Sequence, residues 1–198
     1  MKWIANSLIA FGVAVMFWFG YTLFQQNQTQ SVTIAEAEQA IQTMQSETEN
    51  GAEQDRQGVI DNFSPEMHEA IGVLRVPKID RSIGIVEGTD PDALDLGVGH
   101  MSSTVFPGQG EQIILSGHRD TVFRNFAELE IGDEFIVEMP YGDFTYEIRE
   151  TEIVSADDTS VVRKMGEEVL VVSTCYPFNY LGSAPDRFVF YAYPVDNL

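Results

Sequence analysis

Cysteine and basic residues are both scarce in this sequence. Cys175 is the one cysteine among 198 residues, so no intrachain disulfide can form and a disulfide-stapled mini-domain is excluded. Lysine and arginine total 11 against 31 aspartates and glutamates, which gives a net charge of −20. Because phosphate binding needs clustered basic side chains, we expect no nucleic-acid partner. Hydrophobic residues make up 44% of the chain, which is enough to build a core and excludes wholesale disorder.

Residues 3–24 contain no charged side chain and read WIANSLIAFGVAVMFWFGYTLF. A helix of that length reaches about 33 Å, enough to cross a hydrocarbon core of about 30 Å. The alternative is a cleaved signal peptide, but no small-residue cleavage site follows the apolar run. We therefore expect residues 1–24 to form a cytoplasmic N-terminus and a transmembrane anchor. Lys2 precedes the span, so the positive-inside rule places the remainder of this single-pass protein outside the cell membrane.

Residues 25–62 are rich in glutamine, glutamate, serine and threonine, with Arg56 as their one basic residue. Their polarity predicts an extracellular solvated stalk that holds the following domain away from the membrane. A short amphipathic helix is an alternative for part of it, because apolar residues recur at spacings of three and four. These residues are Ile34, Ala37, Ile41 and Met44.

Residues 63–198 have the pattern of one globular, mostly β domain. Short runs of β-forming residues are separated by turn signals, as in antiparallel barrels and sandwiches. The predicted strands are 72–76, 83–86, 112–115, 134–138, 144–148, 169–172 and 188–191. Helical segments are few, and the candidates follow Asp90-Pro91 and lie near residues 123–129.

Cys175 ends an apolar strand that Pro177 stops, so the thiol is expected at the mouth of a sheet. A lone cysteine is often a buried, inert hydrophobe. Outside the cell, however, a cysteine with no disulfide partner is also a candidate reactive thiol. Ser173 and Thr174 precede it and either line a substrate site or fill alternate faces of the strand.

Two histidines and an arginine are candidates to assist such a thiol. His118 follows the apolar run 113–115 and could transfer protons near neutral pH, although an exposed loop histidine is the alternative. Arg187 opens the strand after Cys175 and could stabilise an oxyanion, or could simply pair with a nearby acid. His100 lies in a glycine-rich turn and could line a substrate site. Asp120 is expected to cap the helix that follows it, or to orient Arg119.

At these residues the sequence resembles a sortase. The matching features are the N-terminal apolar segment, Gly117-His118-Arg119-Asp120, the strand Val171-Val172-Ser173-Thr174-Cys175, and Arg187. The sortase signature is usually written Thr-Leu-x-Thr-Cys; here valines stand at its first two positions. The short chain, the apolar segment and the Gly-His-Arg-Asp motif look most like class D sortases.

The resemblance implies an eight-stranded sortase-type β-barrel with a few short helices, preceded by the N-terminal transmembrane helix. It implies a cysteine transpeptidase of Gram-positive bacteria that cuts an LPxTG-like C-terminal sorting signal after threonine. Cys175 would form a thioacyl enzyme, His118 would transfer protons, and Arg187 would stabilise the oxyanion. The surface protein would then pass to an amine acceptor, either a peptidoglycan precursor or another surface protein.

Two other functions remain open at this point. A membrane-anchored cysteine peptidase would hydrolyse the same acyl enzyme, and a non-catalytic module would bind peptides with Cys175 buried. No cofactor is expected. Although acidic residues are abundant, no segment has EF-hand ligand spacing, so no metal is predicted.

Overall fold

The computed structural model describes residues 2–49, 56–179, 182 and 184–195. Residues 50–55 of the expected stalk lie outside the described residues. The helices are α1 (Lys2–Glu49), α2 (Arg56–Asp61) and α3 (Pro91–Leu96), with 3-10 turns η1 (Pro77–Ile79) and η2 (Phe126–Glu128). The strands are β1 (Ala70–Val76), β2 (Arg81–Glu87), β3 (Val98–His100), β4 (Gln112–Gly117), β5 (Glu134–Met139), β6 (Gly142–Ser155), β7 (Val169–Tyr176) and β8 (Asp186–Pro194).

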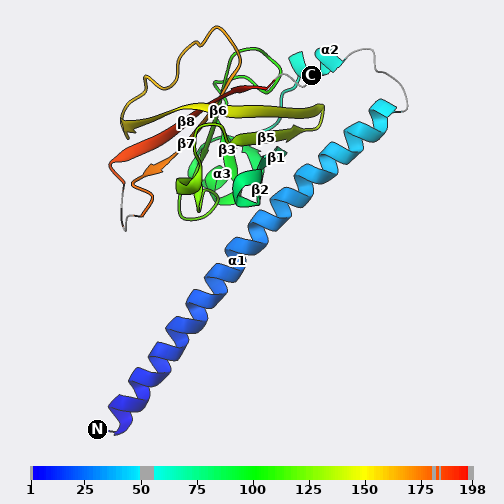
Figure 1. The fold of residues 1–198 in the computed structure, drawn as a ribbon. Helices are drawn as coiled ribbons and strands as arrows, with labels where there is room; N and C mark the ends of the chain where they lie inside the picture. The colour runs from blue at the N-terminus through cyan, green and yellow to red at the C-terminus, as the bar shows by residue number, and fades with distance from the viewer. Residues whose placement is uncertain (1, 50–55, 180–181, 183, 196–198) are drawn as a thin grey trace.

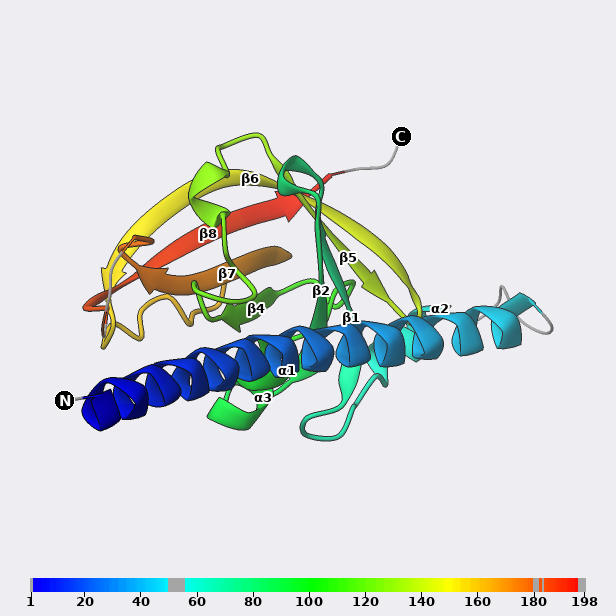
Figure 2. The same cartoon turned by 90° about the horizontal axis from the view of Figure 1, so that it is seen from below.

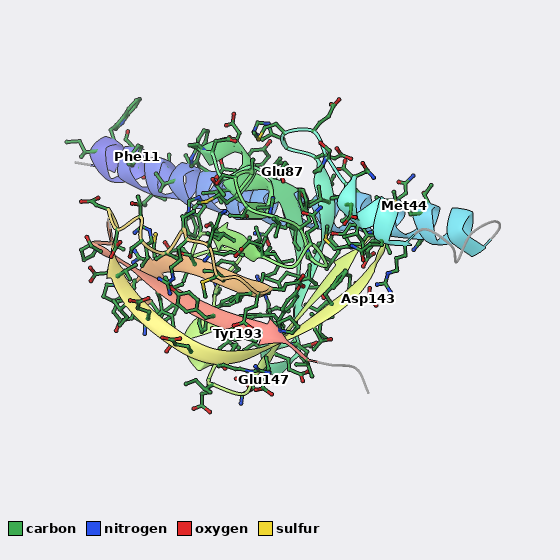
Figure 3. All side chains as sticks on the ribbon, turned by 90° about the horizontal axis from the view of Figure 1, so that it is seen from above. Phe11, Met44, Glu87, Asp143, Glu147 and Tyr193 are labelled. Carbon is green, nitrogen blue, oxygen red and sulfur yellow. The ribbon has the colours of Figure 1, made fainter. Side chains whose placement is uncertain are left out.

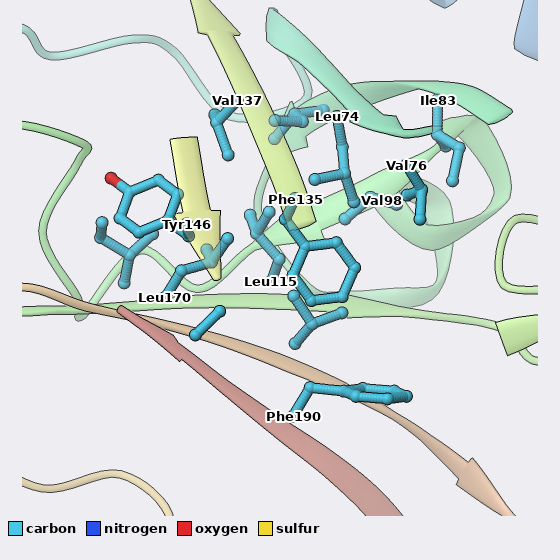
Figure 4. Packing of buried hydrophobic residues seen from close by; sticks show 14 of the residues in the cluster. Leu74, Val76, Ile83, Val98, Leu115, Phe135, Val137, Tyr146, Leu170 and Phe190 are labelled. Carbon is cyan, nitrogen blue, oxygen red and sulfur yellow. The ribbon is translucent and has the colours of Figure 1, made fainter. Parts of the chain in front are cut away.

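The eight strands close into a barrel in the order β1-β2-β3-β4-β7-β8-β6-β5 (Figure 1). The β2–β3 and β4–β7 pairs are parallel and the other neighbours are antiparallel. Alternate residues of each strand point inward and fill the barrel with side chains such as Leu115, Phe135 and Phe190 (Figure 4). The expected eight-stranded barrel with few helices is therefore confirmed.

Two strands differ from the sequence prediction. β3 forms where a glycine-rich turn was expected, because its glycines allow backbones to approach closely. A Cβ on Gly97 would lie 2.4 Å from the carbonyl oxygen of Gly84, and one on Gly99 would lie 2.3 Å from that of Gly88. β6 continues past the predicted end at Ile148 to Ser155, because its second half pairs with β8.

Helix α1 is continuous from the apolar N-terminal residues into the segment expected to be a stalk (Figures 1 and 2). Its N-terminal half stands clear of the barrel, with Phe11 and Trp18 exposed (Figure 3). Among the residues that the structure describes, no helix has the length and apolar character needed to cross a membrane. The transmembrane helix expected over residues 3–24 is therefore not found in the described part of the chain.

The second half of α1 packs on the outside of β1 and β2. Thr33, Ala37 and Ile41 are buried there, and Thr33 Oγ1 donates a hydrogen bond to the Leu96 carbonyl at 3.0 Å. Gly84 of β2 makes this approach possible, because a Cβ at that position would lie 2.6 Å from Thr33 Cγ2. This part of the chain thus lies against the barrel instead of holding it at a distance.

The connection between β7 and β8 lies at the end of the barrel nearer the N-terminal half of α1 (Figures 1 and 2). The β5–β6 turn lies at the opposite end, toward the C-terminus of α1. The barrel therefore has one end, carrying the β7–β8 connection, that is directed toward the apolar part of the helix.

Candidate active site

Cys175 lies near the end of β7, one residue before the strand stops at Tyr176. Pro177 follows, and a proline has no N–H with which to continue a strand ladder. The thiol is free and only partly buried, unlike the fully buried valines Val171 and Val172 of the same strand. A thiol in this position is open to a reaction partner.

The pairing of β4 with β7 brings His118 to the level of Cys175. The two strands run parallel, and their last pair is Gly117 with Thr174. His118 and Cys175 are the next residues of the two chains. Both residues therefore lie at the same end of the sheet. His118 is exposed there.

The turn after His118 fixes its position. The His118 carbonyl accepts hydrogen bonds from the backbone N–H groups of Thr121 at 3.3 Å and Phe123 at 3.1 Å. The residue before it must be glycine, because a Cβ on Gly117 would lie 2.6 Å from Val122 Cγ2 and 2.7 Å from Phe123 Cε2. The chain therefore turns sharply while His118 stays at the strand end.

Arg187 stands on the other side of Cys175. It is the second residue of β8 and the direct antiparallel partner of Cys175. Its Nη1 atom donates to the carbonyls of Asp186 at 3.0 Å and Ala184 at 3.5 Å. Because β4, β7 and β8 are neighbours in the barrel, Cys175 and Arg187 lie side by side on two strands and His118 directly follows the third. We call these three residues the row.

The same outer face continues away from this row as a covered apolar surface. Ser116 and Ser173 form the next half-buried pair. Beyond them is a second buried cluster made by Ile114, Val154, Val161, Val169, Val171, Val189 and Tyr191. Ser173 therefore lies between the row and this cluster, on the same face of the sheet as Cys175. Within the cluster, burial, followed by the hydrogen bond to Glu152, raises the pKa of Tyr191 to about 12.

The connection between β6 and β7 is held over this surface by two polar residues at the start of β4. Gln112 Nε2 donates to the Val161 carbonyl at 2.8 Å. The Glu111 carboxylate accepts from the Met165 N–H at 2.6 Å and from the Gly166 N–H at 3.3 Å. These backbone hydrogen bonds, that from Met165 foremost, lower the pKa of Glu111.

Thr174 and His100, both suggested as substrate contacts by the sequence, lie inside the barrel and away from this face. Thr174 is 2% exposed, and its hydroxyl donates to the Gly117 carbonyl at 2.9 Å. His100 is 1% exposed. Its Nδ1 lies 2.7 Å from Glu87 Oε2 and its Nε2 lies 3.0 Å from the Val105 carbonyl. We assign both residues structural roles in place of substrate contacts.

Arg119 is a residue whose role sequence reasoning missed. It is 7% exposed, and its guanidinium donates to the carbonyls of Pro177 and Gly182, both at 2.8 Å. Its Nε also donates to Asp120 Oδ1 at 3.3 Å, so Asp120 contacts Arg119, whereas Asn125 occupies the N-cap of η2. The signal available in the sequence was a basic residue directly after the candidate histidine of an acidic domain.

No group of three or more His, Cys, Asp or Glu residues in the described part of the chain is arranged to hold a metal ion. The chemistry of the described site is that of a thiol, an imidazole and a guanidinium. Such a set can carry out nucleophilic attack on a carbonyl, proton transfer and oxyanion stabilisation.

Comparison with known proteins identifies the family. Residues 74–195 match the family model for the sortase domain. The chain is 44% identical over 187 residues to sortase D of Bacillus subtilis (strain 168), covering 93% of each chain. The structure of a Clostridium perfringens sortase D5 transpeptidase superposes with a TM-score of 0.68 at 25% identity, covering 85% of this chain and 99% of the other. The catalytic domain of B. anthracis SrtD gives 0.56 at 38% identity, covering 67% and 94%.

The family-model match covers seven strands in full and β1 from Leu74 onward. It includes His118, Cys175 and Arg187. The family model, the curated relative and the solved structures thus agree, and the chain belongs to the sortase family of cysteine transpeptidases.

Proposed function

We propose that this enzyme cleaves an LPxTG-like C-terminal sorting signal after its threonine and transfers the surface protein to an amine acceptor of the cell wall. The observation that supports the proposal is that Cys175 and Arg187 are cross-strand partners on β7 and β8, while His118 directly follows β4, the other neighbour of β7. A nucleophile flanked by a proton donor and a fixed cation is the combination that acyl transfer needs.

In the first half-reaction the Cys175 sulfur attacks the threonine carbonyl carbon and a C–S bond forms. The negative charge that develops on the carbonyl oxygen is stabilised by Arg187. A guanidinium has five N–H donors, so Arg187 can bind the oxyanion while it also contacts the Ala184 carbonyl of the β7–β8 connection. The thiol proton passes to His118 when the sulfur attacks, and His118 gives that proton to the departing amine as the C–N bond breaks, which leaves the thioacyl enzyme.

In the second half-reaction an amine attacks the thioester carbon. His118 takes a proton from the incoming amine as a new C–N bond forms. When the C–S bond breaks, His118 passes that proton to the sulfur and the Cys175 thiol is restored. The acceptor is an amine of a peptidoglycan precursor or of another surface protein. Water that attacked instead would make the protein a peptidase, and that outcome is distinguished by the products.

The test uses the full chain in detergent with a library of Leu-Pro-x-Thr-x peptides. Mass spectrometry follows the mass added at Cys175 and the products with and without an amine acceptor. We expect an acyl adduct that becomes a ligated peptide, and none with Cys175→Ala. An adduct that only hydrolyses at every acceptor concentration contradicts the transpeptidase assignment. An alkylation-resistant Cys175 that forms no adduct indicates a binding module instead.

We also propose that the apolar N-terminal part of α1 attaches the enzyme to the cell membrane, with the barrel on its outer side. The proposal is supported by large apolar side chains that are exposed on this part of the helix, among them Trp3 at 89%, Phe11 at 69% and Trp18 at 75%. Leaving such a surface in water is costly, at about 25 cal/mol per Å² of apolar area.

Extraction of cell membranes tests this attachment. We expect the protein to remain with the membrane after alkaline carbonate treatment, and protease added to intact protoplasts to remove the barrel. The variant Phe11→Ser/Phe17→Ser is expected to be released more readily. Release of the wild-type protein by carbonate would exclude an integral anchor, and protection of the barrel from protease would reverse the orientation.

A further inference from the structure

Arg119 occupies an unusual environment for an arginine in a chain with a net charge of −20. Its side chain is buried, and its strongest described contacts are to backbone carbonyls rather than to a buried acid. The neighbouring Asp120 carboxylate, at 3.3 Å, has a side chain that is 75% exposed. A charged group is expensive to bury unless its donors are satisfied, so the fit of the guanidinium to these carbonyls is specific.

The two carbonyls belong to the connection that joins the other two residues of the row. Pro177 comes two residues after Cys175, and Gly182 comes five residues before Arg187. Arg119 itself directly follows His118. A single planar side chain therefore connects the turn that carries His118 to the loop that links Cys175 with Arg187.

Arg81 of β2 also holds the turn that follows His118. Arg81 Nη2 donates to the carbonyls of Thr121 and Val122, both at 3.3 Å. With the turn fixed to β2 in this way, the contacts of Arg119 determine where the β7–β8 loop lies relative to His118. A lysine cannot reproduce them, because one ammonium is a point donor whereas the guanidinium is a rigid fork.

We propose that Arg119 is a positioning residue of the active site: by binding the Pro177 and Gly182 carbonyls, it holds the β7–β8 loop against the His118 turn. The position of His118 relative to Cys175 then depends on this side chain, whereas the pairing of β7 with β8 already places Arg187 beside Cys175. The catalytic consequence rests on the proposed function, while the structural consequence can be measured without any substrate.

The substrate-free test uses amide hydrogen exchange of the full chain in detergent. Arg119→Lys keeps the charge and the alkyl stem, and Arg119→Gln removes the charge. Loss of charge-assisted hydrogen bonds should speed exchange of residues 176–186 by about tenfold in both variants. The matched control is Arg124→Ala, because Arg124 is exposed on the same turn and bonds only locally to the Asp120 carbonyl in the contacts described. Unchanged exchange in Arg119→Lys would overturn the proposal.

The second readout is the pH dependence of Cys175 alkylation by iodoacetamide, which a purely structural role in the loop would not alter. We expect Arg119→Lys to shift the midpoint of that profile and to lower kcat for a signal peptide about tenfold with little change in KM. If exchange is faster but the alkylation profile and kcat stay at wild-type values, Arg119 stabilises the loop and does not position the active site. If the wild-type enzyme ligates no peptide while exchange and alkylation change as expected, the proposed function fails and the positioning role stands.

Discussion

Cys175 and Arg187 are direct cross-strand partners on β7 and β8, although eleven residues lie between them in the sequence. Their side chains therefore belong to the same face of the sheet. This pairing places a fixed cation beside the nucleophile without help from any loop. Since β-sheet register cannot shift by one residue without turning side chains to the other face, the relationship is set by the barrel core.

Arg187→Lys is expected to lower kcat/KM for a sorting-signal peptide by about 100-fold, because lysine keeps the charge but loses the fork that can bind an oxyanion and the loop together. The measurement is steady-state kinetics with a fluorogenic peptide. Arg163→Lys, an exposed arginine on the β6–β7 connection, serves as the control. Full activity in Arg187→Ala would show that the oxyanion role is wrongly assigned.

His118→Ala is expected to reduce kcat by between 10² and 10⁴, the usual contribution of a positioned general acid or base. His68→Ala is the matched control, because His68 is a partly exposed histidine that bonds to Asp90 at 2.9 Å and is remote in the barrel order from the row. We expect the control to stay within about twofold of wild type. Equal losses in the two variants would remove His118 from the mechanism.

Glu87→Gln is expected to destabilise the protein by about 1–3 kcal/mol, because it disturbs the buried hydrogen bond between the Glu87 carboxyl group and His100. His100 Nδ1 lies 2.7 Å from Glu87 Oε2, and its Nε2 lies 3.0 Å from the Val105 carbonyl oxygen. Urea unfolding measures the effect, and the exposed Glu130→Gln is the control. Wild-type stability in Glu87→Gln would show that this hydrogen bond contributes little to the free energy of unfolding.

Ala37→Leu tests the packing of α1 on the barrel. Ala37 is fully buried against Val73, so three added carbons must displace neighbours, at a cost of about 1–3 kcal/mol. Ala35→Leu places the same side chain on an exposed position two residues away and should change stability by less than about 0.5 kcal/mol. Thermal unfolding of both variants makes the comparison. A stable Ala37→Leu would show that the helix does not stay docked in solution.

Glu111→Gln tests the pH dependence of the β6–β7 connection. The pKa of Glu111 is lowered from 4.5 by the Met165 N–H and its neighbours, so the folded state favours the ionised carboxylate. Its stabilisation is present above pH 4.5 and is lost as the pH falls through the lowered value. The melting temperature of wild type should exceed that of Glu111→Gln at pH 7, and the gap should close toward pH 3.

Glu167→Gln is the control for this prediction, because Glu167 is an exposed carboxylate of the same connection. Its melting temperature should follow that of the wild type across the whole range. A gap between wild type and Glu111→Gln that stays constant with pH would show that the ionised form is not what the loop binds.

The strands of the barrel were predictable from sequence because a half-buried strand alternates polar and apolar residues, as in residues 144–148. The expected proximity of Cys175 and Arg187 on neighbouring strands is also confirmed. β3 was missed because glycine suggests a turn when its neighbours are unknown. Here Gly97 and Gly99 are needed because other backbones pass within contact of them.

The sequence could not predict which polar residues are buried. Nothing in the residues around His100 or Arg119 indicates that their partners are Glu87, Pro177 and Gly182, because these contacts depend on the closed barrel. For α1, the amphipathic alternative through Ile34, Ala37, Ile41 and Met44 indicated the buried side correctly, because Ala37 and Ile41 are buried and Ile34 packs beside them. Its partner surface on β2 was not indicated, because a glycine makes it.

The unbroken course of α1 sets how far the enzyme can act from a membrane. In the proposed attached state, the helix rises only about 14 Å between residue 24 and the docked Thr33. A flexible linker would let the barrel take up a wider range of distances from the membrane. The barrel end that carries the β7–β8 connection is directed back along the helix. The Cys175 thiol would thus stay close to the lipid surface. Only a peptide that is itself held at the bilayer surface would then reach it.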